Sequence, residues 1–212
     1  MGRRSLHTAE ELRELIIGAS TELIQQSGLG GLSAREIARR INYSPGTLYN
    51  SFENLDDLVL TIEGRLLDGL LHALASVPQG GDPRERVHQI ANCYLAFAAR
   101  DPNLWNLLFE HHIPSSRTVP DWYRQKLEAL MGKVEDALLP LSEGLSPEEV
   151  RRAARVLWAG MHGISSLSAA DKLSIIAADD ASVLMDDLVR NYLVGFEAQQ
   201  RSHREGGEAR HA

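Results

Sequence analysis

The chain lacks the features that several classes of protein require. It has one cysteine, Cys93, so no disulfide can form within it, and a lone cysteine is typical of a reducing compartment. No apolar run reaches the ~18 residues that a membrane-spanning helix needs. The N-terminal stretch MGRRSLHTAEELREL has arginines but no apolar segment after them, which argues against a secretory signal. We therefore expect a cytoplasmic protein that does not contact a membrane.

Motifs for catalysis and metal binding are also missing. The sequence has no Gly-rich phosphate loop, no nucleophile elbow and no HExxH motif. His111 and His112 are adjacent, so on a helix they point to different faces, and no His-x3-His pair accompanies the single cysteine. We expect no enzyme activity, no metal site and no cofactor.

Positive charge is scarce. The chain has a net charge of -7 and only three lysines, all after residue 125. Residues 1–52 hold six arginines and five glutamates, a net charge of +1, whereas the rest carries -8. If this N-terminal part binds a nucleic acid, any cationic contact with phosphate must come from arginine, and the non-specific affinity of one copy should be modest. Dimerisation would then be needed to reach a useful affinity.

Helical spacing dominates the sequence, and strand-like alternation is not found in it. Thr8 with Glu11 and Ser33 with Glu36 have the spacing of capping boxes. Proline at the first helical position follows Asp101 and Ser146. These signals predict an all-α fold of about nine helices, at 8–27, 34–41, 45–51, 55–77, 83–100, 102–112, 121–139, 147–170 and 180–200. Residues 171–179 are ambiguous, and residues 201–212 are expected to be a flexible tail.

Two of the short predicted helices, 34–41 and 45–51, form a helix-turn-helix pattern. Asn42-Tyr43-Ser44 makes the turn, Ser44 can cap the second helix, and Leu48 and Phe52 face the core. A polar outer face on the second helix is what entry into a major groove requires. The residues expected to contact DNA are Ser33, Arg35, Ser44, Pro45, Gly46, Thr47, Tyr49 and Asn50. The alternative is an ordinary helical hairpin with solvated polar residues, and spacing alone leaves both open.

The run LSAREIARRINYSPGTLYNSF at 32–52 resembles the DNA-binding signature of the TetR family. That pattern leads from a Ser/Thr cap through xxIAxxxGVS to xGTLYxxF, and the resemblance covers roughly residues 8–60. It implies a reader of double-stranded DNA, with a domain at 1–54 that binds DNA and a domain at 55–200 that binds ligand and dimerises. It also implies that Thr47 and Tyr49 lie in the major groove, while Ser33 and Arg35 touch phosphates.

The sequence departs from the family pattern at two points. Asn42 stands where the family usually has glycine, and asparagine is the next-best residue for a positive backbone angle. An acidic stretch, Glu53 to Asp56, replaces a commonly basic one that often meets a phosphate. Phosphate contacts are then expected from helix amides, Arg35 and the N-terminal Arg3 and Arg4, for which a solvated tail is the alternative.

The predicted helix 55–77 links the two domains in TetR-like proteins. Its apolar residues at four-residue spacing are expected to be buried, and its acidic residues are expected to face water. The apolar set is Leu58, Ile62, Leu66 and Leu70, and the acidic set is Asp57, Glu63 and Asp68.

The C-terminal part resembles a TetR ligand-binding domain through Trp158, His162 and Gly163. Aromatic and soft residues gather in the middle helices, and a ligand pocket is mostly apolar with a few polar groups. We therefore expect a small-molecule effector of apolar or aromatic character, although ordinary core packing is the alternative for any of these side chains. The candidates are Tyr94, Phe97, Trp105, Phe109, Trp122, Trp158, Met161 and His162.

The last two predicted helices are expected to form a homodimer through a two-fold interface. The candidate residues are Leu157, Ile164, Leu184, Leu188 and Tyr192; the alternative is a hairpin buried within a monomer. The hypothesis is a repressor that a ligand releases from a palindromic operator. The competing hypothesis is a helical binding module whose DNA-reading part has lost its function, which the acidic total and the missing cation favour.

Overall fold

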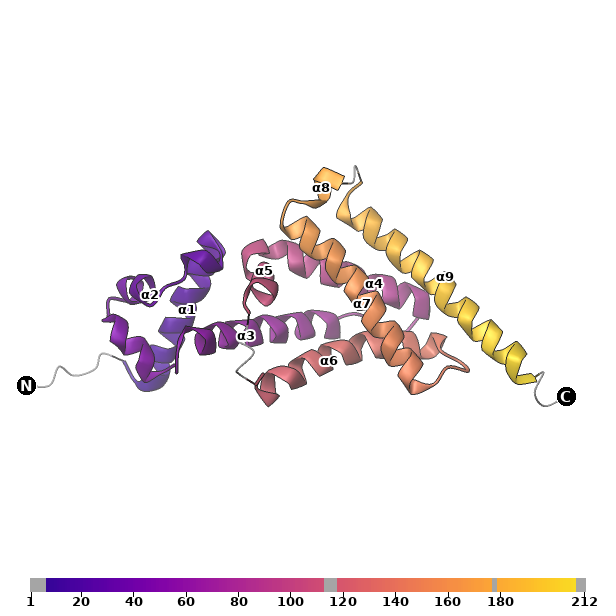
Figure 1. Cartoon of the computed structure of the whole chain (residues 1–212), viewed down its shortest axis with the longest axis horizontal. Coiled ribbons are helices and arrows are strands. Elements are labelled where there is room, and N and C mark those ends of the chain that lie inside the picture. Colours follow the sequence, from indigo (N-terminus) through magenta and orange to yellow (C-terminus); the bar gives the residue numbers. More distant parts are fainter. Residues whose placement is uncertain (1–6, 113–117, 177–178, 209–212) are drawn as a thin grey trace, which may run out of the picture. The chain divides into compact units, whose positions relative to one another are not determined.

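The computed structural model describes residues 7–112, 118–176 and 179–208, which form helices and no strand (Figure 1). The all-α prediction is confirmed. The α-helices are α1 (Ala9–Ser27), α2 (Ala34–Ile41), α3 (Leu55–Ala75), α4 (Pro83–Arg100), α5 (Pro102–Glu110), α6 (Asp121–Leu138), α7 (Pro147–Ala169), α8 (Leu173–Ile176) and α9 (Ala181–Glu208). Three segments are 3-10 helices, namely η1 (Leu29–Gly31), η2 (Pro45–Asn50) and η3 (Leu139–Leu141).

The helix starts follow the capping chemistry of the sequence. Thr8 and Ser146 each form a complete capping box, in which the hydroxyl accepts from the amide three residues on and the glutamate accepts from the cap amide. Ser33 accepts from the Glu36 amide at 3.2 Å, but the Glu36 carboxylate accepts from Arg39. Half of that predicted capping box therefore forms.

Two predicted elements differ from the structure, and one stretch that the sequence left open is assigned by it. The helix expected at 45–51 is the 3-10 helix η2, because this six-residue segment closes through i to i+3 bonds such as Thr47 N–H to Ser44 O at 3.0 Å. The ambiguous stretch after residue 170 contains α8. The predicted tail was placed too early, because α9 continues to Glu208 through residues that include good helix formers and no proline. Residues 209–212 lie outside the described part.

The contacts divide the chain into two compact units. Unit 1 comprises Met1–Leu66 and Asp101–Tyr123, and unit 2 comprises Leu67–Arg100 and Arg124–Ala212. The division falls within α3 and gives α5 to unit 1, because α5 packs on α1. The predicted domain boundary at residue 54 does not coincide with the division between these units. It stays a prediction.

Unit 1 is built on a core to which each of its α-helices contributes. Ile16 and Ile24 of α1, Ile37 of α2 and Leu107 of α5 are each 0% exposed. The part of α3 in this unit adds Leu58, Val59 and Ile62. Burial of each such side chain stabilises the fold by about 1.5–3 kcal/mol. Leu107 therefore makes α5 an integral part of the first unit.

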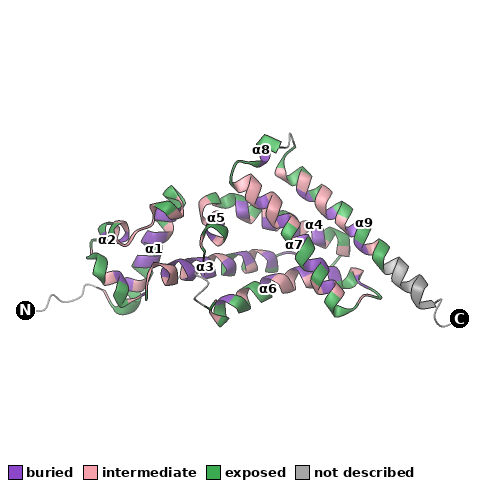
Figure 2. Cartoon of the chain, viewed as in Figure 1, coloured by how far each residue is buried: buried purple, intermediate pink, exposed green. Residues whose placement is uncertain are grey.

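Unit 2 contains the mutually packed helices α4, α7 and α9. Their contact faces carry fully buried side chains, namely Leu157 and Met161 of α7 and Met185 and Val189 of α9. Figure 2 shows buried, half-buried and exposed positions alternating along α7 and α9. One stripe of each helix is therefore used within the chain, and the neighbouring stripes remain accessible. In the described part of the chain, every helix is too short or too polar to cross a bilayer.

Candidate DNA-binding and effector sites

The turn between α2 and η2 depends on a left-handed residue. Asn42 has φ 60° and ψ 44°, and Tyr43 N–H donates to the Ala38 carbonyl at 2.9 Å. The expected positive backbone angle at Asn42 is thus confirmed. This backbone reversal starts the segment that leads to η2.

The second helix of the motif has a buried side and an exposed polar side. Leu48 and Phe52 are 2% and 3% exposed, whereas Tyr49 is 54% exposed. Pro45, Gly46 and Asn50 are also exposed, and Ser33 and Thr47 are half-buried. The prediction that Ser44 caps the helix is wrong, because its hydroxyl pairs with the Thr47 hydroxyl at 2.9 Å and makes no capping bond to a backbone amide. Ser44, Tyr49 and Asn50 are therefore exposed polar residues of this face.

Two contacts hold this motif to the N-terminal part of the unit. Arg13 of α1 donates to the Ser51 carbonyl at 2.7 Å and lies 4.2 Å from the centroid of the Phe52 ring. His7 Nδ1 lies 2.7 Å from the Tyr43 hydroxyl. These contacts therefore hold the chain just before and just after η2, which fixes the orientation of its exposed face.

The cations of the motif differ in how far they are engaged. Arg39 is bound to Glu36, and Arg40 bonds Gln26 at 2.7 Å and lies 3.5 Å from Glu22. Arg35 is exposed at the start of α2, and within the described ranges no ion pair involves it. Arg3 and Arg4 lie outside the described residues, so their expected contacts with phosphate stay a prediction.

The acidic stretch before α3 has a structural use. Asn54 accepts from the Asp57 amide at 3.0 Å, and Asp57 accepts from the Glu53 amide at 3.1 Å, so together they cap α3. Asp56 Oδ1 lies 3.6 Å from His111 Nε2. These residues stabilise the start of the helix where the family pattern would offer a cation to DNA.

A contact between the buried Glu63 and His111 in unit 1 was not expected from the sequence. Glu63, predicted to face water, is 2% exposed, and its carboxylate lies 2.9 Å from His111 Nδ1. The Glu63 hydrogen bond raises the pKa of His111, against a lowering by burial. A signal was available, since Val59, Glu63 and Leu67 follow one another at four-residue spacing and Val59 and Leu67 are apolar.

A polar cluster in unit 2 brings three of the predicted effector residues together. Tyr94 is 2% exposed, and its hydroxyl lies 3.1 Å from His162 Nδ1. The Ser166 hydroxyl lies 2.9 Å from His162 Nε2, and the Trp158 ring stacks on His162 with centroids 5.4 Å apart. Burial lowers the pKa of His162 to about 4, so the ring is neutral near pH 7. The cluster presents hydroxyl and imidazole groups without formal charge.

The other predicted effector residues are spread over both units. In unit 2, Met161 is fully buried, and Phe97 is half-buried under the Arg100 guanidinium, 5.5 Å from the ring centroid. In unit 1, the Trp105 and Phe109 rings lie 6.2 Å apart, and Trp122 is 41% exposed. Among the described residues, no group of three or more His, Cys, Asp or Glu side chains is arranged to hold a metal ion.

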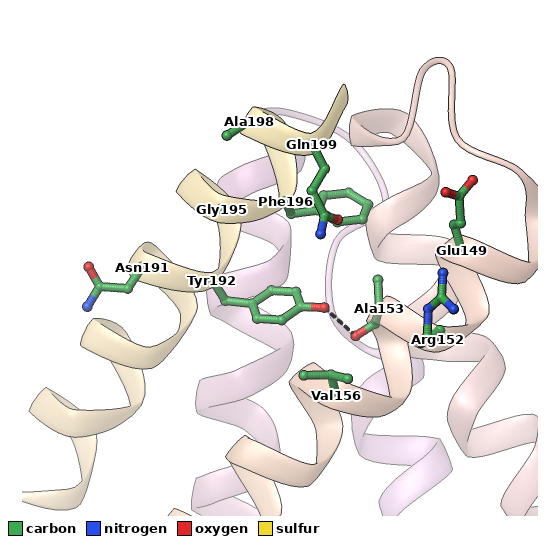
Figure 3. Close-up of a pocket in the computed structure, with 10 residues that line it drawn as sticks. All are labelled: Glu149, Arg152, Ala153, Val156, Asn191, Tyr192, Gly195, Phe196, Ala198 and Gln199. Carbon is green, nitrogen blue, oxygen red and sulfur yellow. Dashed lines mark hydrogen bonds between the residues drawn. The ribbon is translucent and has the colours of Figure 1, made fainter. Parts of the chain in front are cut away.

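An open groove of about 720 Å³ lies along α7 and α9 (Figure 3). Tyr192 spans it and donates from its hydroxyl to the Ala153 carbonyl at 2.7 Å. Val156, on the α7 side, is 56% exposed. Among the predicted dimer residues, Ile164, Leu184, Leu188 and Tyr192 are half-buried, whereas Leu157 is 0% exposed. Packing within the chain thus already uses the whole Leu157 side chain.

Two family models match the chain. Residues 16–62 match the model described as bacterial regulatory proteins, tetR family. Residues 87–192 match the model described as tetracyclin repressor-like, C-terminal domain. The first match includes the whole helix-turn-helix, and the second includes the Tyr94–His162 cluster.

Individual relatives are similar over most of their length. The chain is 24% identical to an uncharacterised HTH-type transcriptional regulator of Mycobacterium tuberculosis, covering 87% of this chain and 81% of that protein. A solved Rhodococcus protein of unknown function has a TM-score of 0.72 at 21% identity, covering 92% and 98% of the two chains. FadR of Thermus thermophilus, a TetR-family repressor solved with lauroyl-CoA, has a TM-score of 0.62 at 24% identity, covering 85% and 93%.

An exposed polar recognition segment on a helix-turn-helix, followed by a second helical domain, defines a DNA-binding transcriptional regulator. The chain belongs to the TetR family of such regulators.

Proposed function

We propose that this protein is a repressor that binds a palindromic operator as a homodimer and is released from it by a small molecule. The observation that carries the proposal is the polar face of η2, where Tyr49 is 54% exposed while Leu48 beside it is buried. Exposure of a large apolar ring to water is unfavourable. Bound DNA would cover the Tyr49 ring.

Each exposed group of the motif has a role that its chemistry allows. Thr47 and Asn50 hydrogen-bond base edges or phosphates, and the Tyr49 ring meets a thymine methyl while its hydroxyl reaches a phosphate. The free amides at the start of α2, with Ser33 and Arg35 beside them, bind a phosphate. Ser44, Pro45 and Gly46 keep the backbone close to the DNA, since none of them carries a long side chain.

The dimer that we propose uses the accessible stripe of α7 and α9. Leu184, Leu188 and Tyr192 repeat at four-residue spacing on α9 and are half-buried, as expected for a face that a partner completes. On α7 the proposed contact is Val156 together with Ile164, in place of Leu157, which has no free surface. A two-fold interface here would match the symmetry of a palindromic operator.

The effector site that we propose includes Tyr94, Trp158 and His162. These groups are polar and uncharged near pH 7, so they suit a carbonyl or hydroxyl on an otherwise apolar molecule. The lauroyl-CoA bound by the Thermus FadR is a molecule of that kind at its acyl end, which makes it a rational first compound to test. Phe97 and Met161, the other predicted positions in unit 2, are proposed as its apolar lining, whereas the predicted positions Trp105, Phe109 and Trp122 belong to unit 1.

The response to the ligand would pass along α4. Tyr94 lies on this helix six residues before its end at Arg100, and the next residue, Asp101, begins the segment that belongs to unit 1. A ligand shifts the equilibrium only if it binds the released conformation more tightly than the DNA-bound one. Movement of the end of α4 would then displace α5, which packs on α1 of the DNA-reading unit.

The proposal is tested by binding of the purified protein to a fragment from its own promoter at two salt concentrations. Tight, salt-sensitive binding that Tyr49→Ala abolishes, and that Tyr49→Phe retains in part, is the expected result. A folded dimer that binds neither this fragment nor any member of a random-sequence pool would favour the competing hypothesis, in which the DNA-binding domain has lost its function. Binding that Tyr49→Ala leaves unchanged would show that η2 does not read the DNA.

A further inference from the structure

The segment Asp101–Tyr123 follows α4 in the chain but belongs to unit 1. It is fastened to α1 at its start, where Asn103 donates to the Gln25 carbonyl at 2.8 Å and the Gln25 amide donates to Asp101 at 2.5 Å. Leu107, in the middle of α5, is fully buried in the core of the unit. A further attachment lies at the end of α5, where His111 is the C-cap residue of the helix.

His111 contacts a carboxylate that is almost completely buried. Glu63 of α3 is 2% exposed, and its Oε1 lies 2.9 Å from His111 Nδ1. The other ring nitrogen faces Asp56 Oδ1 at 3.6 Å, which is an ion-pair distance longer than a hydrogen bond. A buried carboxylate costs several kcal/mol unless a counter-charge and hydrogen bonds compensate it. Protonated His111 supplies that charge between two acidic side chains of α3.

We propose that His111 and Glu63 form a proton-operated latch, which holds the end of α5 against α3 while His111 is charged and frees it when the proton leaves. On deprotonation the imidazole retains one N–H, so the charge that balanced Glu63 and Asp56 is lost. The two carboxylates then repel each other, because no cation lies between them. The bonds at the start of α5 and the buried Leu107 side chain then remain as its attachments to the unit.

The surroundings of the pair favour the charged state of His111. Asp56 and Glu63 face it from α3, and the Tyr123 hydroxyl from the start of α6 interacts with Glu63. On its own element, His111 N–H bonds the Leu107 carbonyl at 3.1 Å at the end of α5, where the helix dipole stabilises a cation. The side chain of His112, the next residue, turns back to the Glu110 carbonyl and is exposed.

The direction of the pH response follows from the raised pKa of His111. Its folded pKa lies above the ordinary value of 6.5, so the folded state keeps the proton to higher pH than the unfolded chain does. The latch therefore contributes its full stability below about pH 6.5 and loses it as the pH rises through the folded pKa. Movement of α5 at alkaline pH would reach the DNA-reading unit directly, because α5 is part of that unit.

The test is amide hydrogen exchange of the full-length protein from pH 6 to pH 9, corrected for intrinsic exchange rates and read by mass spectrometry. As the pH rises over this range, we expect the amide protection of residues 102–111 to fall by about tenfold for each pH unit by which the folded pKa of His111 exceeds 6.5. Helix α7 serves as an internal reference. His111→Gln and Glu63→Gln should remove this pH dependence. His112→Gln, the matched control at an exposed neighbour, should retain it.

The pH profile of amide exchange in the wild-type protein tests the latch even if a variant at the buried pair does not fold. Protection of residues 102–111 that stays constant between pH 6 and pH 9, or that changes in parallel with α7, would overturn the latch. Loss of the pH dependence in His112→Gln would overturn it as well, because the titrating group would then be the exposed histidine. None of these readouts needs an operator or an effector.

Discussion

Arg13 donates from its guanidinium to the backbone carbonyl of Ser51 at 2.7 Å, which fastens the end of η2 to α1. The same guanidinium covers the Phe52 ring. A 3-10 helix of six residues has few internal hydrogen bonds, and their geometry is poorer than in an α-helix. This contact from α1 therefore helps to fix the orientation of η2.

Replacement of Arg13 should weaken DNA binding although its side chain is bound within the protein. We expect Arg13→Met to lower the free energy of unfolding by about 1.5–3 kcal/mol, the usual contribution of a hydrogen bond from a charged group, and to lower affinity with it. Arg35→Gln, at an exposed site, should change stability by less than about 0.5 kcal/mol and reduce the salt slope of binding by about 1. Thermal melts and fluorescence anisotropy of both variants separate the two roles. Equal melting temperatures would contradict the anchoring role of Arg13.

Asn42 offers a second test of the motif, through its backbone. Its left-handed conformation costs a residue with a bulky Cβ about 1–2 kcal/mol. We expect Asn42→Gly to be close to neutral in stability and Asn42→Val to destabilise the protein by that amount, with a matching loss of operator affinity. Denaturant unfolding measures the first effect. A neutral Asn42→Val variant would mean that the turn can adopt another conformation.

His162 predicts a pH dependence on the acid side. Its folded pKa is about 4, below the ordinary value of 6.5, so the unfolded chain takes up a proton first as the pH falls. The contribution of His162 to stability is therefore complete above about pH 6.5 and declines as the pH falls toward 4. In melts at pH 7.5, 5.5 and 4.5, His162→Gln should lose less stability on acidification than the wild type. His72→Gln, at an exposed position, should follow the wild type.

Local chemistry explains which parts of the fold could be predicted. Thr8 and Ser146 cap helices because their hydroxyls need only an amide and a glutamate three residues away. Asn42 was expected to take a positive backbone angle because few residues tolerate one. The recognition segment followed from a signature whose apolar positions, such as Leu48 and Phe52, are buried. Each of these depends on neighbours within a few positions.

What could not be predicted depends on partners distant in the sequence. Glu63 was expected in water because it is acidic, and its burial is compensated by distant partners, His111, 48 residues later, and Tyr123. Leu157 was expected at an interface because it is apolar, yet the packing of α4, α7 and α9 already covers it. The membership of α5 in the first unit depends on its packing against α1, which no local pattern of α5 reveals.

The proposed dimer face can be tested with two valines of similar exposure. Val156 is 56% exposed and lines the groove of α7 and α9, whereas Val194 of α9 is 62% exposed and is not among the groove residues. A buried, unpaired carboxylate at an interface is strongly unfavourable, so Val156→Asp should shift a wild-type dimer toward monomer at micromolar concentration. Val194→Asp should remain dimeric, as light scattering after size-exclusion chromatography would show. The opposite pattern would place the interface on the other side of α9. Operator affinity should fall only in the variant that dissociates, because a single DNA-binding domain is expected to bind weakly.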